Sequence, residues 1–283
     1  MSSAAKVVFI TGANTGLGLE TVKSLLRSST AYTILLGGRD FQKATSASEE
    51  AKKEYAESSS TIEPVQIDVE SDESIQQAFD TISKKHGKVD TLINNAGKWY
   101  YSVRTRWPTD CVGASFDQSF SQRNMTLRQM WNKSWDVNVS GTFVLTHTFI
   151  PLLLKSSEPR LIFITSGTST LAEHDNQKLP INHSPRAGWP KQSLMIPAYR
   201  SSKCGLNMMM AEWDRLLKED GVKVVAISPG MLATNLGGAG PDALRKMGAI
   251  EPQIGADFIR DVVEGGRDGD MGKVIRKDMI QPW

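Results

Sequence analysis

Tyr199 and Lys203 are a pair of side chains that can carry out acid–base chemistry. They lie four residues apart in the segment 196–203 (IPAYRSSK), and a helix that begins near Pro197 places both on one face. A phenol titrates near pH ~10 and a lysine near ~10.4, so a neighbouring ammonium favours the phenolate and lowers the pKa of the tyrosine. Such a spacing is also typical of a solvated helix face. Its significance therefore depends on the rest of the chain.

A glycine-rich turn lies near the start of the chain, between a predicted strand and a predicted helix. Residues 6–11 (KVVFIT) form a short apolar run, and residues 17–26 carry apolar side chains at helical spacing. Glycines in the turn allow a tight bend and let a phosphate approach the free amides at the helix N-terminus. The dinucleotide-binding residues predicted here are Gly12, Asn14, Thr15, Gly16, Leu17 and Gly18. A plain glycine-containing loop is the alternative, which the position at the start of a βα unit disfavours.

The residues after the second predicted strand indicate which dinucleotide is bound. This strand covers residues 32–37 (YTILLG), and Gly38, Arg39 and Asp40 follow it. In dinucleotide-binding folds an acid at this point binds the ribose 2′-hydroxyl, whereas a nearby arginine suits a 2′-phosphate. Because Gly38 occupies the place of the acid, the sequence predicts NADP(H), with Arg39 at the 2′-phosphate. A solvated arginine is the alternative, but a cation opposes the dipole at a helix start.

Three further strand ends bring polar or small residues to the same edge of the sheet. Ligands of open parallel sheets bind outside the carboxyl ends of the strands. The third strand, 62–67, ends before Asp68 and Val69, which we expect beside the adenine. The fourth, 89–93, leads into a segment of amide and small residues that can lock neighbouring loops by hydrogen bonds. The predicted cofactor residues of that segment are Asn95, Ala96 and Gly97, and the fifth strand, 160–165, delivers Ser166.

Strands and helices alternate along the whole chain. Beyond those already given, the pattern predicts an exposed helix and its loop at 40–60, helices at 71–86, 126–155, 198–220 and 252–264, and strands at 222–228 and 273–276. This alternation is typical of a parallel sheet with helices on both faces. No linker and no internal repeat divides the chain. The predicted fold is α/β, a single doubly wound Rossmann-type domain over residues 1–283 with a mostly parallel seven-stranded sheet.

Three segments depart from the alternation and are predicted to border the substrate. Two are long active-site loops at 98–125 and 167–195, and the third is a Gly- and Ala-rich substrate lid at 231–250. The first loop holds Trp99, Tyr100, Tyr101, Trp107, Phe116 and Phe120, and the second adds Trp189. Such rings offer flat apolar contact, so we expect a bulky, aromatic or polycyclic substrate. The alternative is that they pack the loops onto the body or cover a subunit face.

Composition excludes several classes of partner. The 283 residues carry a formal net charge of +2, with basic residues scattered along the chain, so neither nucleic acid nor an anionic membrane is indicated. No stretch resembles an export signal or a membrane span, which predicts a cytoplasmic protein. The two cysteines, Cys111 and Cys204, and the four histidines show no ligand spacing, so no metal site is expected.

Taken together, these motifs resemble the short-chain dehydrogenase/reductase family in type and order. The matching residues are Thr11 to Gly18, Asn94 to Gly97, Asn138, Ser166, the Tyr199 and Lys203 pair, and Pro229-Gly230. The resemblance implies a catalytic set of Asn138, Ser166, Tyr199 and Lys203. It also implies that Tyr199 and Lys203 contact the nicotinamide half of the cofactor, and adds Pro229, Gly230 and Thr234 to the cofactor site.

The spacing differs from the usual family pattern at two places. Ser166 and Tyr199 are 33 positions apart, more than is usual, and the interval from Asn95 to Asn138 is also enlarged. An enlarged segment before the tyrosine helix resembles that of monomeric carbonyl reductases of the family, where it covers a helix face otherwise used for tetramer packing. The resemblance therefore implies a monomer or a homodimer.

The implied activity is NADPH-dependent reduction of a carbonyl or imine group. In the family mechanism hydride reaches the carbonyl carbon, Tyr199 protonates the oxygen, Ser166 holds that oxygen, and Lys203 stabilises the tyrosinate and binds the ribose. Asn138 would hold a water that returns protons to Lys203. Two alternatives stay open: a biosynthetic enzyme that couples reduction to cyclisation or epimerisation, and a non-catalytic dinucleotide-binding regulator. The intact Ser166, Tyr199 and Lys203 argue against the regulator.

Overall fold

A twisted sheet of short apolar strands forms the centre of the protein. The structure is a computed structural model that describes residues 5–97, 126–189, 196–236 and 238–283. Within these residues the sheet has eight strands in the order β3-β2-β1-β4-β5-β6-β7-β8. The strands are β1 (Lys6–Ile10), β2 (Tyr32–Gly38), β3 (Thr61–Gln66), β4 (Thr91–Asn94), β5 (Arg160–Ile164), β6 (Lys223–Ile227), β7 (Val274–Arg276) and β8 (Met279–Ile280). All neighbours pair in parallel except β7 and β8.

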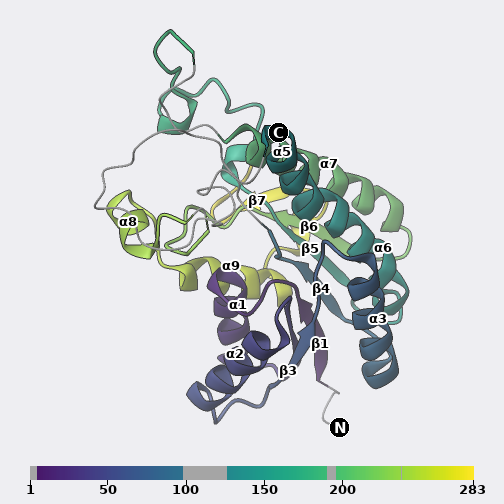
Figure 1. Ribbon diagram of the computed structural model, residues 1–283. Helices are drawn as coiled ribbons and strands as arrows, with labels where there is room; N and C mark the ends of the chain where they lie inside the picture. The colour runs from purple at the N-terminus through teal and green to yellow at the C-terminus, as the bar shows by residue number, and fades with distance from the viewer. Residues whose placement is uncertain (1–4, 98–125, 190–195, 237) are drawn as a thin grey trace.

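Helices cover both faces of the sheet. They are α1 (Gly16–Leu26), α2 (Phe41–Glu54), α3 (Asp72–His86), α5 (Leu127–Trp135), α6 (Gly141–Leu153), α7 (Pro197–Leu217), α8 (Pro241–Lys246) and α9 (Pro252–Val263). Figure 1 shows α1, α2 and α9 on one face, and α3, α5, α6 and α7 on the other. Successive residues of a strand point to opposite faces. Accordingly, buried Phe9 joins the core under α3, α6 and α7, while buried Ile10 joins the core under α1, α2 and α9.

The predicted α/β, doubly wound, mostly parallel fold is confirmed, and one strand exceeds the predicted count. The additional strand is β8, which pairs antiparallel with β7 in a hairpin through Lys277 and Asp278. Its two residues are exposed. A strand of this length gives no alternation of apolar and polar residues, so the pattern could not reveal it.

The long helix predicted over 126–155 is interrupted by one π-helical turn. Thr126 begins it with a capping box shared with Gln129. A π-helical turn, Asp136–Ser140, then separates α5 from α6. Such a turn inserts one residue into the helical repeat and occurs frequently at functional sites. Apolar periodicity cannot show an insertion of one residue, so the sequence predicted a single regular helix.

The predicted loop and lid segments are only partly described. Residues 98–125, with all six of their aromatic side chains, lie outside the described residues. Residues 167–189 contain two short 3₁₀ turns, Gly167–Ser169 and Pro180–Asn182. The segment predicted as a lid contains α8, and its two ends are joined by backbone bonds of 2.9 Å from Ala233 to Ile250 and from Ile250 to Met231.

None of the described helices is both long enough and apolar enough to cross a membrane.

Candidate active site

Two loops interlock where the chain leaves β1 and β4. These strands are neighbours in the sheet, and this is where the strand order reverses, so a crevice opens outside their carboxyl ends. The Asn95 side-chain amide donates to the carbonyl oxygens of Thr11 at 2.8 Å and Gly12 at 3.0 Å. In return, the Thr11 hydroxyl accepts the backbone N–H of Asn95 at 3.2 Å and of Ala96 at 3.0 Å. These four bonds fix the shape of the crevice floor.

The glycine turn has the geometry of an anion-binding cradle. Gly12 and Gly16 adopt φ of 61° and 57°, which L side chains rarely adopt. A Cβ atom at Gly18 would lie 2.5 Å from both the Asn95 amide nitrogen and the Gly12 carbonyl oxygen. At the start of α1, Thr15 makes no side-chain capping bond and the first turn holds no acid. The backbone amides there are thus suited to hold a phosphate.

The predicted 2′-phosphate end lies at the carboxyl end of β2. A Cβ atom at Gly38 would lie 3.2 Å from the Asn14 side-chain oxygen, so the glycine turn contacts the end of β2 here. The Arg39 side chain is 57% exposed, and its Nη1 lies 3.6 Å from Glu70 Oε2. Lys133 Nζ lies 3.5 Å from the other oxygen of Glu70. Arg39 therefore stands at the rim of the crevice in a loose ion pair.

The other predicted cofactor residues lie along the same edge. The backbone N–H of Asp68 donates a hydrogen bond to Ser74 Oγ at 2.9 Å, and Asp68 Oδ1 accepts one from the backbone N–H of Glu70 at 3.1 Å. Thr234 faces the glycine turn, because a Cβ atom at Gly16 would lie 3.7 Å from Thr234 Cβ. The other cofactor positions are Leu17 at the start of α1, Val69 after β3, Ala96 and Gly97 after β4, and Pro229 and Gly230 after β6.

Three elements converge at Gly97. A Cβ atom at this glycine would lie 3.2 Å from Asn138 Oδ1 and 3.3 Å from Lys203 Nζ. The end of β4, the π-helical turn and α7 thus meet at one point. Asn138 is fully buried, and its amide donates to Ser202 Oγ at 3.0 Å. The Ser202 hydroxyl donates in turn to the Tyr199 carbonyl oxygen at 3.0 Å, which links Asn138 to the first turn of α7.

Tyr199 and Ser166 form the hydroxyl pair of the site. Pro197 begins α7, as predicted, and Tyr199 is 6% exposed. Burial raises the pKa of its phenol, and the side-chain hydrogen bond with Ser166 opposes this with a smaller effect. The sequence had suggested the opposite direction, a pKa lowered by Lys203. That expectation was wrong because it took account of charge but not of desolvation.

Lys203 is a buried side chain on α7, one helical turn after Tyr199. It is 4% exposed, and its Nζ donates to the Ile164 carbonyl oxygen at 2.7 Å. Burial lowers the pKa of Lys203 to about 8. This amine therefore changes charge close to the physiological range, unlike a solvated lysine.

The structure brings the predicted catalytic residues to the edge of the sheet at which the parallel strands end. It also shows four residues with contacts at this edge that the sequence analysis did not single out. The sequence identifies Thr11 only as part of the glycine turn. Its hydroxyl at a strand end could nevertheless have indicated a side chain that hydrogen-bonds to a neighbouring loop. Ser202 lies one residue before Lys203 and gave no signal of its own. Gly141 lies against Val69, where a Cβ atom would be 2.0 Å from the Val69 carbonyl oxygen. Arg200 contacts the segment after β5.

An uncapped helix start beside a glycine turn, with Ser166 after β5 bonded to buried Tyr199 one turn before Lys203 on α7, is the arrangement of a Rossmann-type oxidoreductase that takes a nicotinamide dinucleotide. The sequence model described as short chain dehydrogenase matches residues 6–176 and 181–243. The chain belongs to the short-chain dehydrogenase/reductase family.

Relatives of similar length share much of the sequence. The short-chain dehydrogenase/reductase eupG of Phoma sp. is 44% identical over 286 residues, which cover 98% of this chain and 97% of eupG. The short-chain dehydrogenase/reductase tropE of Talaromyces stipitatus is 40% identical over 282 residues, which cover 98% of each chain. The similarity thus extends over nearly the whole length of each chain.

Solved structures share the fold at low sequence identity. An NADPH-bound carbonyl reductase from chicken fatty liver superposes with a TM-score of 0.74 at 22% identity, covering 99% of both chains. A 3-ketoacyl-(acyl-carrier-protein) reductase from Brucella melitensis, in complex with NADH, gives a TM-score of 0.69 at 19% identity and covers 97% of both chains. Solved structures with this fold therefore contain NADPH in one case and NADH in the other.

Proposed function

We propose that the protein is an NADPH-dependent reductase that converts a carbonyl or imine group of a bulky small molecule into the alcohol or amine. The observation that carries this proposal is the side-chain hydrogen bond between Ser166 and buried Tyr199, which lies one turn before Lys203 on α7. A hydroxyl pair next to a dinucleotide crevice can hold and protonate the oxygen of a polarised double bond. The glycine turn and the exposed Arg39 fit the phosphate groups of NADPH.

The chain's own residues hold and move the proton. When bound, the cofactor supplies hydride to the carbonyl carbon. Tyr199 donates its proton to the oxygen that gains charge, and its raised pKa keeps the phenol protonated until then. Ser166 donates a hydrogen bond to the same oxygen and fixes its position. Lys203 stabilises the resulting tyrosinate and binds the ribose hydroxyls, and Asn138 positions a water that returns protons to Lys203.

The pH dependence of the reaction is expected to follow Lys203. Its ammonium must be charged to stabilise the tyrosinate, and its pKa is about 8. The value of kcat/KM for NADPH should therefore be constant at lower pH and fall about tenfold per pH unit above pH 8. Tyr199 does not titrate in this window because its pKa is raised. The measurement is a profile of kcat/KM from about pH 6 to about pH 9.5. A profile that stays flat throughout contradicts the role of Lys203.

Arg39 is expected to set the cofactor preference. The 2′-phosphate would replace Glu70 as its partner, and a charge-assisted contact is worth about 1.5–3 kcal/mol. Arg39→Ala should lower kcat/KM for NADPH by roughly 10- to 100-fold and change the value for NADH little. Arg215→Ala is the control, since this arginine pairs with Glu212 on the exposed side of α7. Equal use of both cofactors by the intact protein would overturn the preference.

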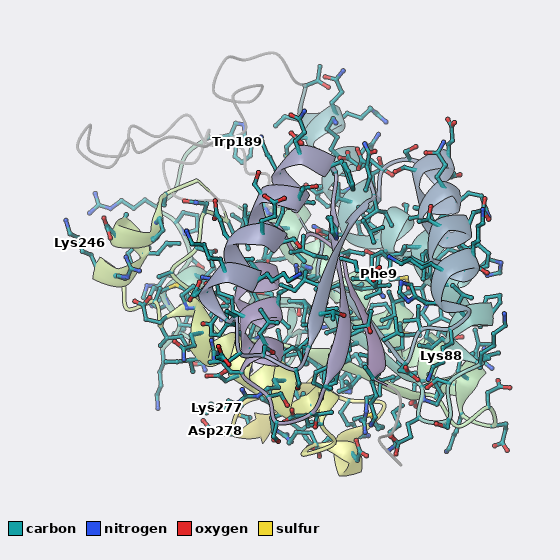
Figure 2. All side chains as sticks on the ribbon, turned by 90° about the horizontal axis from the view of Figure 1, so that it is seen from below. Phe9, Lys88, Trp189, Lys246, Lys277 and Asp278 are labelled. Atoms are coloured by element: carbon teal, nitrogen blue, oxygen red, sulfur yellow. The ribbon has the colours of Figure 1, made fainter. Side chains whose placement is uncertain are left out.

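The size of the substrate is inferred from the aromatic residues in the segments that follow β4 and β5 along the chain. Six of them lie in residues 98–125, outside the described residues, and Trp189 is 79% exposed. In Figure 2, Trp189 and Lys246 of α8 project on the side of the molecule away from Lys88, which precedes β4 at its amino end. The exposed ring of Trp189, together with the aromatic composition of residues 98–125, favours a large, aromatic or polycyclic substrate.

A panel of substrates tests the proposal and its two alternatives. The experiment measures NADPH oxidation with aliphatic, aromatic and polycyclic ketones, aldehydes and imines, and identifies each product by mass spectrometry. Turnover with kcat/KM highest for the polycyclic compounds supports the proposed function. Products with a closed ring or an inverted stereocentre favour a biosynthetic enzyme. Tight NADPH binding without any turnover favours the regulator.

A further inference from the structure

Arg200 follows Tyr199 directly in the chain and contacts the segment that contains Ser166. Its Nε donates to the Thr168 carbonyl oxygen at 2.9 Å. Its two terminal nitrogens reach the Ile181 carbonyl oxygen at 3.4 Å and Asn182 Oδ1 at 3.0 Å. A single guanidinium on α7 thus bonds to both described 3₁₀ turns of the segment after β5.

The first of these contacts continues to the catalytic hydroxyls. The Thr168 N–H donates to Ser166 Oγ at 3.2 Å, and the hydroxyl oxygens of Thr168 and Ser166 lie 3.0 Å apart. Ser166 in turn bonds to Tyr199. The contacts form a closed ring that runs from Tyr199 to Arg200, Thr168, Ser166 and back to Tyr199. Displacement of the Thr168 turn would therefore move Ser166 relative to the phenol.

The guanidinium makes these bonds at an electrostatic cost. All three acceptors are neutral oxygens, and no ion pair of Arg200 is present among the described residues. Burial lowers the pKa of Arg200. A half-buried cation held only by neutral oxygens contributes less to stability than a paired one. Its three donors, fixed in one plane, are instead well suited to hold two turns in a defined orientation.

We propose that Arg200 is a positioning residue that holds Ser166 at hydrogen-bonding distance from Tyr199 and couples residues 167–182 to the reaction. This inference rests on the proposed function, since it requires Ser166 to act on the substrate oxygen. A misplacement of about 1 Å can cost about 100-fold in rate, so Arg200→Ala should lower kcat by about 10- to 100-fold. The dissociation constant of NADPH should stay unchanged.

A double-mutant cycle with Ser166→Ala tests whether Arg200 acts through Ser166. If it does, Arg200→Ala should lower kcat strongly in the intact protein and by less than about threefold in the Ser166→Ala background. If Arg200→Ala lowers kcat by the same factor with and without Ser166→Ala, the inference is overturned. It is also overturned if Arg200→Ala lowers the melting temperature but not kcat. The control Arg215→Ala, on the same helix, should leave kcat and the melting temperature unchanged. If Arg200→Ala does not fold, Arg200→Lys, which keeps the charge but loses the planar fork, takes its place in the cycle.

The single mutants separate this inference from the proposed function. If Ser166→Ala keeps the full kcat, Ser166 does not act on the substrate and the proposed function fails. If Ser166→Ala loses kcat and Arg200→Ala does not, only the role of Arg200 fails.

Discussion

Replacement of Tyr199 by Phe is expected to lower kcat by at least about 100-fold, because general acid catalysis is worth about 10²- to 10⁴-fold. The phenol is buried, bonded to Ser166 and kept protonated by its raised pKa. Phe keeps the ring and its packing but has no proton to donate. The dissociation constant of NADPH, measured by fluorescence titration, should therefore change little while turnover is lost.

Tyr32→Phe is the matched control for this experiment. Tyr32 is also buried, but it lies on β2, and its hydroxyl is 3.4 Å from Glu264 on the far side of the protein from α7. Its loss should leave kcat unchanged. A Tyr199→Phe protein that retains more than about a tenth of the original kcat refutes the assignment of the general acid.

Substitution of Gly141 by Ala is expected to have the largest effect on stability. The added Cβ atom would lie 2.0 Å from the Val69 carbonyl oxygen and 2.9 Å from its carbon, so the backbone itself must move. Overpacking costs about 1–3 kcal/mol where side chains can yield, and here only backbone is available. We expect a loss of about 3 kcal/mol, which corresponds to a decrease in melting temperature of about 6–12 °C.

The control for Gly141 is another glycine with open surroundings. A Cβ atom at Gly269 meets no atom within 4 Å, and its backbone is outside the left-handed region. Gly269→Ala should therefore change the melting temperature by less than about 1 °C. Equal stability of the two variants in thermal denaturation would show that α6 does not approach Val69 so closely.

The glycine turn and the Tyr-Lys helix could be predicted from the sequence because local chemistry determines them. Gly12 and Gly16 need positive φ, and Pro197 favours a helix start, so each residue type reports its own conformation. Strand ends were predictable for a similar reason. In a parallel sheet all carboxyl ends share one edge, so the order of strands along the chain was sufficient to bring Asn95 and Ser166 to the same edge.

Features that depend on contacts between distant segments were not predictable. The direction of the Tyr199 pKa shift results from burial, which the spacing of Tyr199 and Lys203 does not show. The bonds of Arg200 join residues 18 or more positions apart, across a segment without periodicity. The π-helical turn at Asn138 changes the register by one residue and leaves the apolar pattern nearly unchanged.

The paired ends of residues 231–250 allow this segment to change in sequence and length independently of the rest of the enzyme. Two backbone bonds between Met231, Ala233 and Ile250 close its base beside Gly230. Each doubling of the length of the loop between these bonds costs only about 0.6 kcal/mol. During evolution, residues 235–249 can be exchanged or lengthened while the positions of Tyr199 and the glycine turn are preserved. If this segment borders the substrate, as the sequence predicts, new substrate preferences can arise here without loss of the catalytic geometry.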